Sequence, residues 1–478
     1  MTRATFFFLM GMLCPSLALS GSGHEDVERW YVVRISGAAV GFASETEQYG
    51  EHGIVFRSHT NLSLRRMGTA LSMFMMMEEV DGLDGKFQHA RVEMNTSITS
   101  AVLDGDSVRI EFESGGHVRR TVVAWEDDAV SMSEGDRLVD EWFLSDAPDV
   151  RYKFFSVDDG MFKTVRIERG ESKTEIVNGE EMMLRSMIEY EGDANVPVSI
   201  TWLDENREAV RTVISQMGLE IIVERIDSAE MESIELEPDF DIIRQSMIPV
   251  EGYPDPPEGV KDVTVRLHLT HPVPAGQKFE GPNQHEVGRG EDWVELLLSR
   301  ETVNRITVAP AELQNYLEPG KHIQSDHPSI GAIADSIRAA SGAEGWDLAH
   351  TIAQWVNDWI TGKNFEQGFA SALEVLESRE GDCTEHSILL TSLLRAAGIP
   401  ARPAVGLVYH QGALIGHMWS EAYIDHWRSL DALDLRGDPV RIRISGASGS
   451  NAVNPRDIVA AYAVAGGMTV RVVDYHLR

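Results

Sequence analysis

Residues 381–402, GDCTEHSILLTSLLRAAGIPAR, constrain the fold more than any other stretch of this chain. Asp382 is a favourable helix N-cap, and Glu385 follows at the spacing of a capping box, so a helix is predicted to begin at Cys383. The glycine and proline of the AGIP sequence end it. Four aliphatic residues at helical spacing supply its buried face: Ile388, Leu389, Leu393 and Leu394.

The segments on either side of this helix predict the class of the C-terminal third. Apolar residues at helical spacing indicate two earlier helices within 327–342 and 346–364. After the helix, residues 403–409, 415–424 and 427–433 are typical of short strands. Helices come first and strands follow, so this part of the chain is predicted to be α+β.

The region from about Val27 to Glu230 alternates between apolar and polar residues, as β-strands do. Two strands are predicted around Gly115–Gly116, and a second pair within 162–181. Because no helical stripe longer than three turns stands out here, we expect a large antiparallel, β-rich N-terminal domain.

Proline and glycine mark the boundary after this region. The segment 247–260, MIPVEGYPDPPEGV, reads as a linker, and strand-like stretches continue to about Leu313. We therefore expect four parts, listed in chain order: a signal peptide (1–20), the β-rich domain (21–248), a linker with a small β segment (249–320) and a catalytic domain (321–478).

The N-terminus is typical of a secretory signal peptide that is cleaved before Gly21. Its apolar run is too short for a spanning helix, and no later stretch reaches about 18 consecutive apolar residues. The protein is therefore expected to be periplasmic or secreted, without a membrane span. Cleavage removes Cys14 and leaves Cys383 as the one cysteine, so no internal disulfide is expected.

The charge of the chain excludes one class of partner. Its formal net charge is -34, whereas phosphate binding requires clustered Lys and Arg, so nucleic acid is not expected to bind. The hydrophobic content of 43% is sufficient for folded cores and argues against disorder.

Cys383 itself has two interpretations. A free cysteine is often a small buried residue. A cysteine in the first turn of a helix, however, lies near unsatisfied backbone N–H groups and the positive end of the helix dipole, which favour the thiolate. Its own backbone N–H could also donate to an oxyanion on a carbonyl that the sulfur attacks. Cys383 is therefore a candidate nucleophile.

A thiol nucleophile needs a base, and the base needs a residue that orients it. His417 lies on the strand predicted at 415–424. A three-residue turn centred on Asp425 would make it the diagonal neighbour of Asp431, whereas a two-residue turn would place it opposite Asp434. Spacing leaves both carboxylates open. His386 is a competing base, although it projects from the same helix as Cys383.

The sequences GDCTEHSILLTSLLRAAGIPAR, GHMWSEAY and WRSLDA resemble the core of the transglutaminase-like superfamily, particularly its bacterial exported members. The resemblance covers roughly residues 326–435 and implies a papain-like fold. It implies that Cys383 is the nucleophile, His417 the base and Asp431, rather than Asp434, the orienting residue. The β-rich N-terminal region is similar to regions that precede this core in bacterial homologues.

The resemblance leaves the second oxyanion donor unassigned. Gln354, Trp355 and Gln367 are candidates by residue type only. Met418 stands where the family most often has alanine, and ALDL follows Asp431 in place of the usual Pro-Thr. The acidic calcium-site segments of animal transglutaminases are not recognisable, so we expect no metal and no cofactor.

These features predict a thiol enzyme that acts on amide carbonyls of a protein or peptide substrate, cell-wall peptide included. Attack by water would make it a protease, amidase or deamidase, and attack by a primary amine would make it a crosslinking transglutaminase. The alternative is an inactive envelope scaffold that binds a partner through its β-rich domain.

Overall fold

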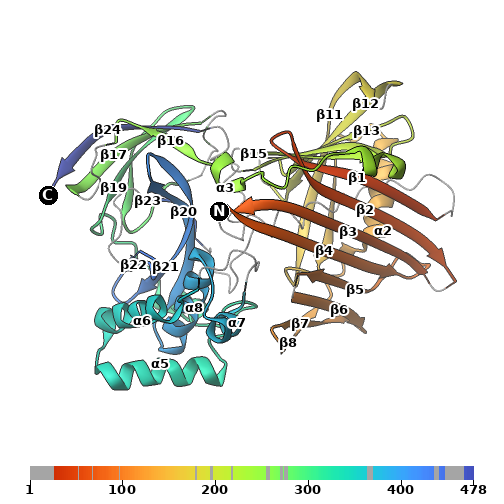
Figure 1. Ribbon diagram of the computed structural model, residues 1–478. Coiled ribbons are helices and arrows are strands. Elements are labelled where there is room, and N and C mark those ends of the chain that lie inside the picture. Colours follow the sequence, from red (N-terminus) through yellow and green to blue (C-terminus); the bar gives the residue numbers. More distant parts are fainter. Residues whose placement is uncertain are drawn as a thin grey trace. The chain divides into compact units, whose positions relative to one another are not determined.

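The computed structural model describes residues 26–51, 53–66, 68–95, 97–177, 180–193, 197–216, 219–253, 259–269, 273, 278–362, 370–434, 441–446 and 468–478. They form two compact units whose main boundary falls between Phe240 and Asp241 (Figure 1). The expected signal peptide lies outside the described residues. Across the ranges given above, no helix combines the length and apolar character needed to cross a membrane.

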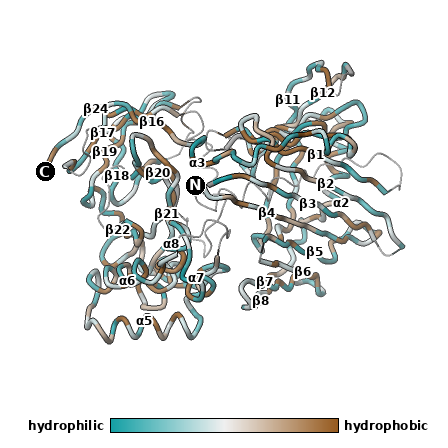
Figure 2. Tube along the Cα trace, in the orientation of Figure 1, coloured by the Kyte–Doolittle hydropathy of each residue, from teal (hydrophilic) through white to brown (hydrophobic). Residues whose placement is uncertain are grey.

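The N-terminal unit is built on a 15-stranded sheet formed by its described residues. Strands β1–β8 and β10–β15 form two antiparallel meanders that join where β1 pairs with β15, while the short edge strand β9 is parallel to β10. Hydrophobic and hydrophilic residues alternate along these strands, as Figure 2 shows. The bounds are β1 (Val27–Ile35), β2 (Ala38–Gly50), β3 (Gly53–Arg66), β4 (Thr69–Asp81), β5 (Phe87–Met94), β6 (Ser97–Asp104), β7 (Ser107–Ser114), β8 (His117–Ala124), β9 (Ala129–Val130), β10 (Asp149–Ser156), β11 (Met161–Val177), β12 (Glu180–Glu191), β13 (Ser199–Leu203), β14 (Ala209–Gln216) and β15 (Leu219–Ile226).

The two ends of this sheet share a hydrophobic core. Phe87 of β5 packs against Phe155 of β10 with ring centroids 6.0 Å apart, and it stacks on Trp125. Helix α2 (Met132–Phe143) contributes Val139 and Trp142 to a second core with β11, β12 and β13. The same helix donates backbone N–H groups to carboxylates of β4, so it packs against both halves of the sheet.

Two details of this unit differ from the sequence-based expectation. Helix α2 was not anticipated, because only Gly135, Val139 and Trp142 of its residues are buried and its apolar stripe is thin. The pair of strands expected within 162–181 is mostly the single strand β11, whose register against β12 shifts between Arg169 and Ser172. Gly170 lies in this irregular stretch, which is a bulge in one strand and not a turn between two.

The C-terminal unit contains a sheet in the order β18-β19-β17-β24-β16-β21-β20-β23, with β22 paired to β21. The segment expected as a linker with a small β segment supplies β17, β18 and β19 to this sheet. Residues 303–313, expected to be strand-like, contain no strand: 303–309 are irregular and Pro310–Leu313 form helix α4. The bounds are β16 (Ile248–Glu251), β17 (Val260–His268), β18 (Gln284–Arg289), β19 (Trp293–Ser299), β20 (Ala401–His410), β21 (Ala413–Tyr423), β22 (Trp427–Leu430), β23 (Arg441–Gly446) and β24 (Thr469–Leu477).

Helix α8 (Cys383–Ala396) lies at the centre of this unit, and its residues from Cys383 to Arg395 are all buried. It packs against β21, β20 and three other helices, so it is enclosed on every side. Two of those helices were expected from the sequence and the third, α7, was not. The helices of the unit are α3 (Ile242–Gln245), α4 (Pro310–Leu313), α5 (Pro328–Ser341), α6 (Gly345–Trp359), α7 (Ala372–Ser378) and α8.

The predicted α+β class is confirmed: a large antiparallel N-terminal sheet precedes a C-terminal helix-and-sheet core. The predicted order of that core is also confirmed, with strands β20, β21 and β22 following α8.

Candidate active site

Helix α8 begins at Cys383, as the capping pattern predicted. The Asp382 carboxylate accepts the backbone N–H of Thr384 over 2.7 Å, and the Glu385 carboxylate accepts that of Asp382 over 3.0 Å. Cys383 is buried and occupies the first helical position, whose N–H has no acceptor within the helix. The cap thus fixes a thiol and a backbone donor side by side.

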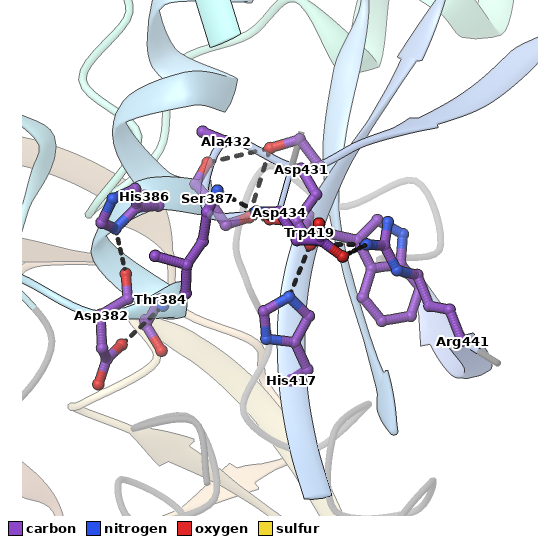
Figure 3. A network of polar contacts seen from close by, with 12 residues as sticks. Asp382, Thr384, His386, Ser387, His417, Trp419, Asp431, Ala432, Asp434 and Arg441 are labelled. Carbon is purple, nitrogen blue, oxygen red and sulfur yellow. Dashed lines mark hydrogen bonds and ion pairs between the residues drawn. The ribbon is translucent and has the colours of Figure 1, made fainter. Parts of the chain in front are cut away.

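Two short strands bring a histidine and a carboxylate toward this helix end. Tyr423 pairs with Trp427, so the turn between β21 and β22 is the three-residue alternative, centred on Asp425. His417 therefore reaches Asp431 across the face of the sheet, and its Nε2–H donates to Asp431 Oδ2 over 2.7 Å (Figure 3).

The Asp431 carboxylate is buried and held from several directions. Its Oδ1 accepts the backbone N–H groups of Leu433 and Asp434 over 3.0 and 3.2 Å. Asn357 of α6 fixes the same loop, because its amide donates to the carbonyl of Ala432 over 2.6 Å. The loop and the carboxylate are therefore rigidly placed.

The charge balance of the pair follows from these contacts. Burial alone would lower the pKa of His417, but the charge and hydrogen bond of Asp431, together with the hydrogen bond and charge of Cys383, raise it to about 10. Burial alone would raise the pKa of Asp431, yet the charges of His417 and Arg441 hold it well below its usual range. Asp431 is therefore ionised, and the His417 imidazole is protonated on both nitrogens, as an imidazolium, at neutral pH.

Trp419 shields the histidine from one side. Its ring stacks on that of His417 with centroids 6.2 Å apart and an interplanar angle of 22°. Gly406 of β20 permits this arrangement, because a Cβ there would lie 2.9 Å from the Trp419 ring and 1.9 Å from the carbonyl oxygen of Ile442. The tryptophan is buried, so the imidazole lies in a water-poor environment.

The competing base, His386, and the other candidate orienting carboxylate, Asp434, are placed differently. His386 is buried, and its Nδ1 lies 2.7 Å from the Asp382 carbonyl oxygen, so that nitrogen is engaged within its own helix. Burial lowers the pKa of His386, and Asp382 opposes only part of that effect. Asp434 is partly exposed and contributes its backbone N–H to Asp431. Neither residue holds the position between Cys383 and a buried carboxylate that His417 occupies.

The structure describes two of the three candidates for the second oxyanion donor. The Gln354 side chain is exposed and donates to Asp358 on the same helix over 2.9 Å. Trp355 stacks on Trp359 with ring centroids 4.8 Å apart. Gln367 lies outside the described residues. The second oxyanion donor is therefore still unassigned.

Arg441 is a site residue that the sequence analysis missed. It lies on β23, and its Nη2 donates to Asp431 Oδ2 over 2.8 Å. The oxygen that accepts from His417 therefore also accepts from an arginine. No local motif marks this residue, because β23 reaches Asp431 only through the order of strands in the sheet.

The arrangement has the parts that nucleophilic catalysis by a thiol requires: a thiol at a helix start, a protonated histidine that touches it and an ionised carboxylate behind the histidine. Within the parts of the chain that the structure describes, no cluster of His, Cys, Asp and Glu has the geometry to hold a metal ion.

Part of the C-terminal unit matches a family of known proteins. Residues 331–432 match the model of the transglutaminase-like superfamily, a range that includes Cys383, His417 and Asp431. The resemblance inferred from the sequence is confirmed for this segment. No match was found among curated proteins.

Three solved structures show partial likeness to the chain. A candidate cysteine protease from Cytophaga hutchinsonii is 16% identical, covers 46% of this chain and 86% of its own, and has a TM-score of 0.28. The periplasmic domain of TgpA from Pseudomonas aeruginosa is 17% identical, with 39% and 86% covered and a TM-score of 0.29. A β-barrel-like protein of a domain of unknown function from Brucella abortus is 7% identical, with 42% and 95% covered and a TM-score of 0.33.

Proposed function

We propose that the C-terminal unit is a thiol-dependent enzyme that transfers or hydrolyses acyl groups at amide bonds. Cys383 is the nucleophile, His417 the general acid and base, and Asp431 the residue that orients the imidazole. The observation that carries the proposal is the bond from His417 Nε2–H to the buried, ionised Asp431, which leaves Nδ1 as the ring nitrogen for Cys383.

The first half of the reaction forms a thioester. The Cys383 thiolate attacks the amide carbonyl carbon, a C–S bond forms and the carbonyl electron pair moves to oxygen. The backbone N–H of Cys383 is positioned to stabilise that oxyanion. His417 then gives its proton to the amide nitrogen, the C–N bond breaks and the amine leaves.

The second half restores the enzyme. Neutral His417 takes a proton from the attacking water or primary amine, a new bond forms at the thioester carbon and the C–S bond breaks. The sulfur leaves as thiolate beside the protonated histidine. Water yields an acid, as in a protease, amidase or deamidase, and an amine yields a new amide, as in a crosslinking enzyme.

We also propose that the protein is exported, with residues 1–20 as its signal peptide, and that it acts on protein or peptide amides that include cell-wall peptides. This extends the sequence interpretation of the N-terminus.

The test of the catalytic proposal is the reactivity of Cys383 with iodoacetamide across pH. In the wild-type protein, alkylation should persist well below the pKa of about 8.5 of a free thiol. In His417→Ala the alkylation rate should depend on pH as it does for an ordinary thiol. A wild-type Cys383 that behaves as a free thiol, or does not react, would support the scaffold alternative instead.

The substrate can be identified by capturing it on a variant that lacks the nucleophile. The Cys383→Ala protein should retain amide substrates from an envelope extract, and mass spectrometry should identify them. Wild-type protein incubated with the captured species and a fluorescent primary amine would then separate hydrolysis from transamidation, because only the latter incorporates the label.

A further inference from the structure

Arg441 and His417 share one oxygen of Asp431. Arg441 Nη2 and His417 Nε2 lie 2.8 and 2.7 Å from Oδ2, and Figure 3 shows them approaching the carboxylate from different sides. The backbone N–H groups of Leu433 and Asp434 take the other oxygen. Among the described residues, the carboxylate thus has four donors, and Arg441 is the one permanent cation.

The guanidinium of Arg441 is enclosed. It is buried, and its central carbon lies 5.1 Å from the centroid of the Trp419 ring that stacks on His417. Asp434 Oδ2 lies 3.8 Å from its Nη2. In a poorly solvated site, a fixed charge at hydrogen-bond distance acts strongly on its neighbours.

We propose that Arg441 is a positioning residue for the triad: it holds the Asp431 carboxylate toward His417 and, through its charge, sets the pH range in which Cys383 is reactive. This inference rests on the function proposed above. Arg441 acts through Asp431 and is assigned no contact with substrate.

The titratable and charged groups around His417 come from three elements. Helix α8 supplies Cys383 and His386, the loop after β22 supplies Asp431 and Asp434, and β23 supplies Arg441. Of these, Arg441 is the one fixed positive charge. Its removal therefore shifts both limits of the reactive range in one direction.

Both limits should move upward in Arg441→Gln. Asp431 would lose a cation that favours its ionised form, so acid would protonate it, and disable the triad, at higher pH. The His417 imidazolium would lose a like charge on the far side of the same oxygen, so it would hold its proton to higher pH. A role in folding alone would lower the rate without moving either limit.

The experiment is the rate of Cys383 alkylation by iodoacetate in the full-length protein. This anionic reagent favours a thiolate beside an imidazolium, so the wild-type rate should rise and then fall as pH increases. In Arg441→Gln both limits should shift upward by about one pH unit or more. Arg441→Lys keeps the charge and should keep the limits at a reduced rate.

Arg443→Gln is the matched control. Arg443 lies two residues along β23 and donates to Glu421 over 2.8 Å, and Glu421 retains Arg402 when this arginine is removed. The pH limits of Cys383 alkylation in the Arg443→Gln protein should equal those of the wild-type protein. Thermal unfolding of each variant shows whether the native fold is retained.

The outcomes are distinguishable. Reduced rates with unmoved limits in Arg441→Gln would overturn the proposal for Arg441 while leaving the triad intact. A shift of both limits in Arg441→Lys away from their wild-type values would also overturn it, and this arm applies even if the glutamine variant does not fold. A wild-type profile that His417→Ala does not change would overturn the triad and the role of Arg441 together.

Discussion

His417 donates from Nε2 to Asp431 Oδ2 over 2.7 Å, and this bond assigns the opposite nitrogen of the ring to Cys383. The geometry depends on the register of two strands, in which Tyr423 faces Trp427 and Asp431 follows directly after β22. A shift of one residue would turn the carboxylate to the other side of the sheet. The turn at Asp425 is therefore part of the site.

Asp431→Asn should disable Cys383 without unfolding the protein. The amide cannot bear the negative charge that keeps His417 protonated, and it can offer an N–H to Nε2. The rate of Cys383 alkylation at pH 6.5 should fall about 100-fold, because an ordinary thiol is about one-hundredth ionised there. Asp434→Asn is the control, since Asp434 serves Asp431 through its backbone, and an equal loss in both variants would contradict the assignment.

The sequence predicted the parts of the site that depend on local pattern. Asp382 and Glu385 mark the start of α8 within four residues, and the spacing of β21 and β22 limits His417 to two carboxylates. Arg441 could not be found in this way, because its contact with Asp431 depends on β20 lying between β21 and β23. The sequence of a single strand does not reveal which strands lie beside it in the sheet.

Helix α2 illustrates the same limit in the N-terminal unit. Its sequence MSEGDRLVDEWF is mostly polar, so periodicity gives a weak signal. Its first two backbone N–H groups nevertheless have acceptors on the sheet: Glu79 and Asp81 of β4 accept those of Met132 and Ser133. These long-range caps add to a local one, in which the Ser131 hydroxyl accepts the backbone N–H of Glu134.

Asp382→Ala should destabilise the C-terminal unit by about 1 kcal/mol, because the variant removes the acceptor for Thr384 N–H at the start of α8. Asp382→Asn keeps an acceptor and should lose less. The free energy of unfolding in urea measures both. If the alanine and asparagine variants unfold alike, the cap is not what stabilises this helix end.

Gly406→Ala should be more damaging than its size suggests. The added Cβ would meet the carbonyl oxygen of Ile442 at 1.9 Å, and backbone in a paired strand cannot move away cheaply. We expect a loss of at least about 2 kcal/mol in unfolding free energy, together with lower Cys383 reactivity as Trp419 is displaced. Gly331→Ala on α5, where nothing lies within 4 Å of the new atom, should be neutral or stabilising, and similar losses at both positions would refute the steric argument.

The N-terminal unit should lose stability as pH rises, because of Glu45 on β2. This carboxyl group is buried, and burial raises its pKa to about 8, while the hydrogen bond from Tyr31 and the charge of Arg29 offset only part of the effect. Between about pH 4.5 and 8 the folded chain therefore keeps a proton that the unfolded chain has released. The free energy of unfolding should fall as pH rises through this range, by up to about 1.4 kcal/mol per pH unit for this group.

Glu45→Gln tests this dependence because it keeps the shape of the side chain and an acceptor for Tyr31 but cannot ionise. Its unfolding free energy, measured in urea at several pH values between 5 and 8, should fall less steeply than that of the wild-type protein. Glu113→Gln, at an exposed position on β7, should leave the wild-type slope unchanged. Equal slopes in the Glu45→Gln and wild-type proteins would mean that Glu45 is ionised in the folded state, and that other buried carboxyl groups, such as Glu79, account for any pH dependence.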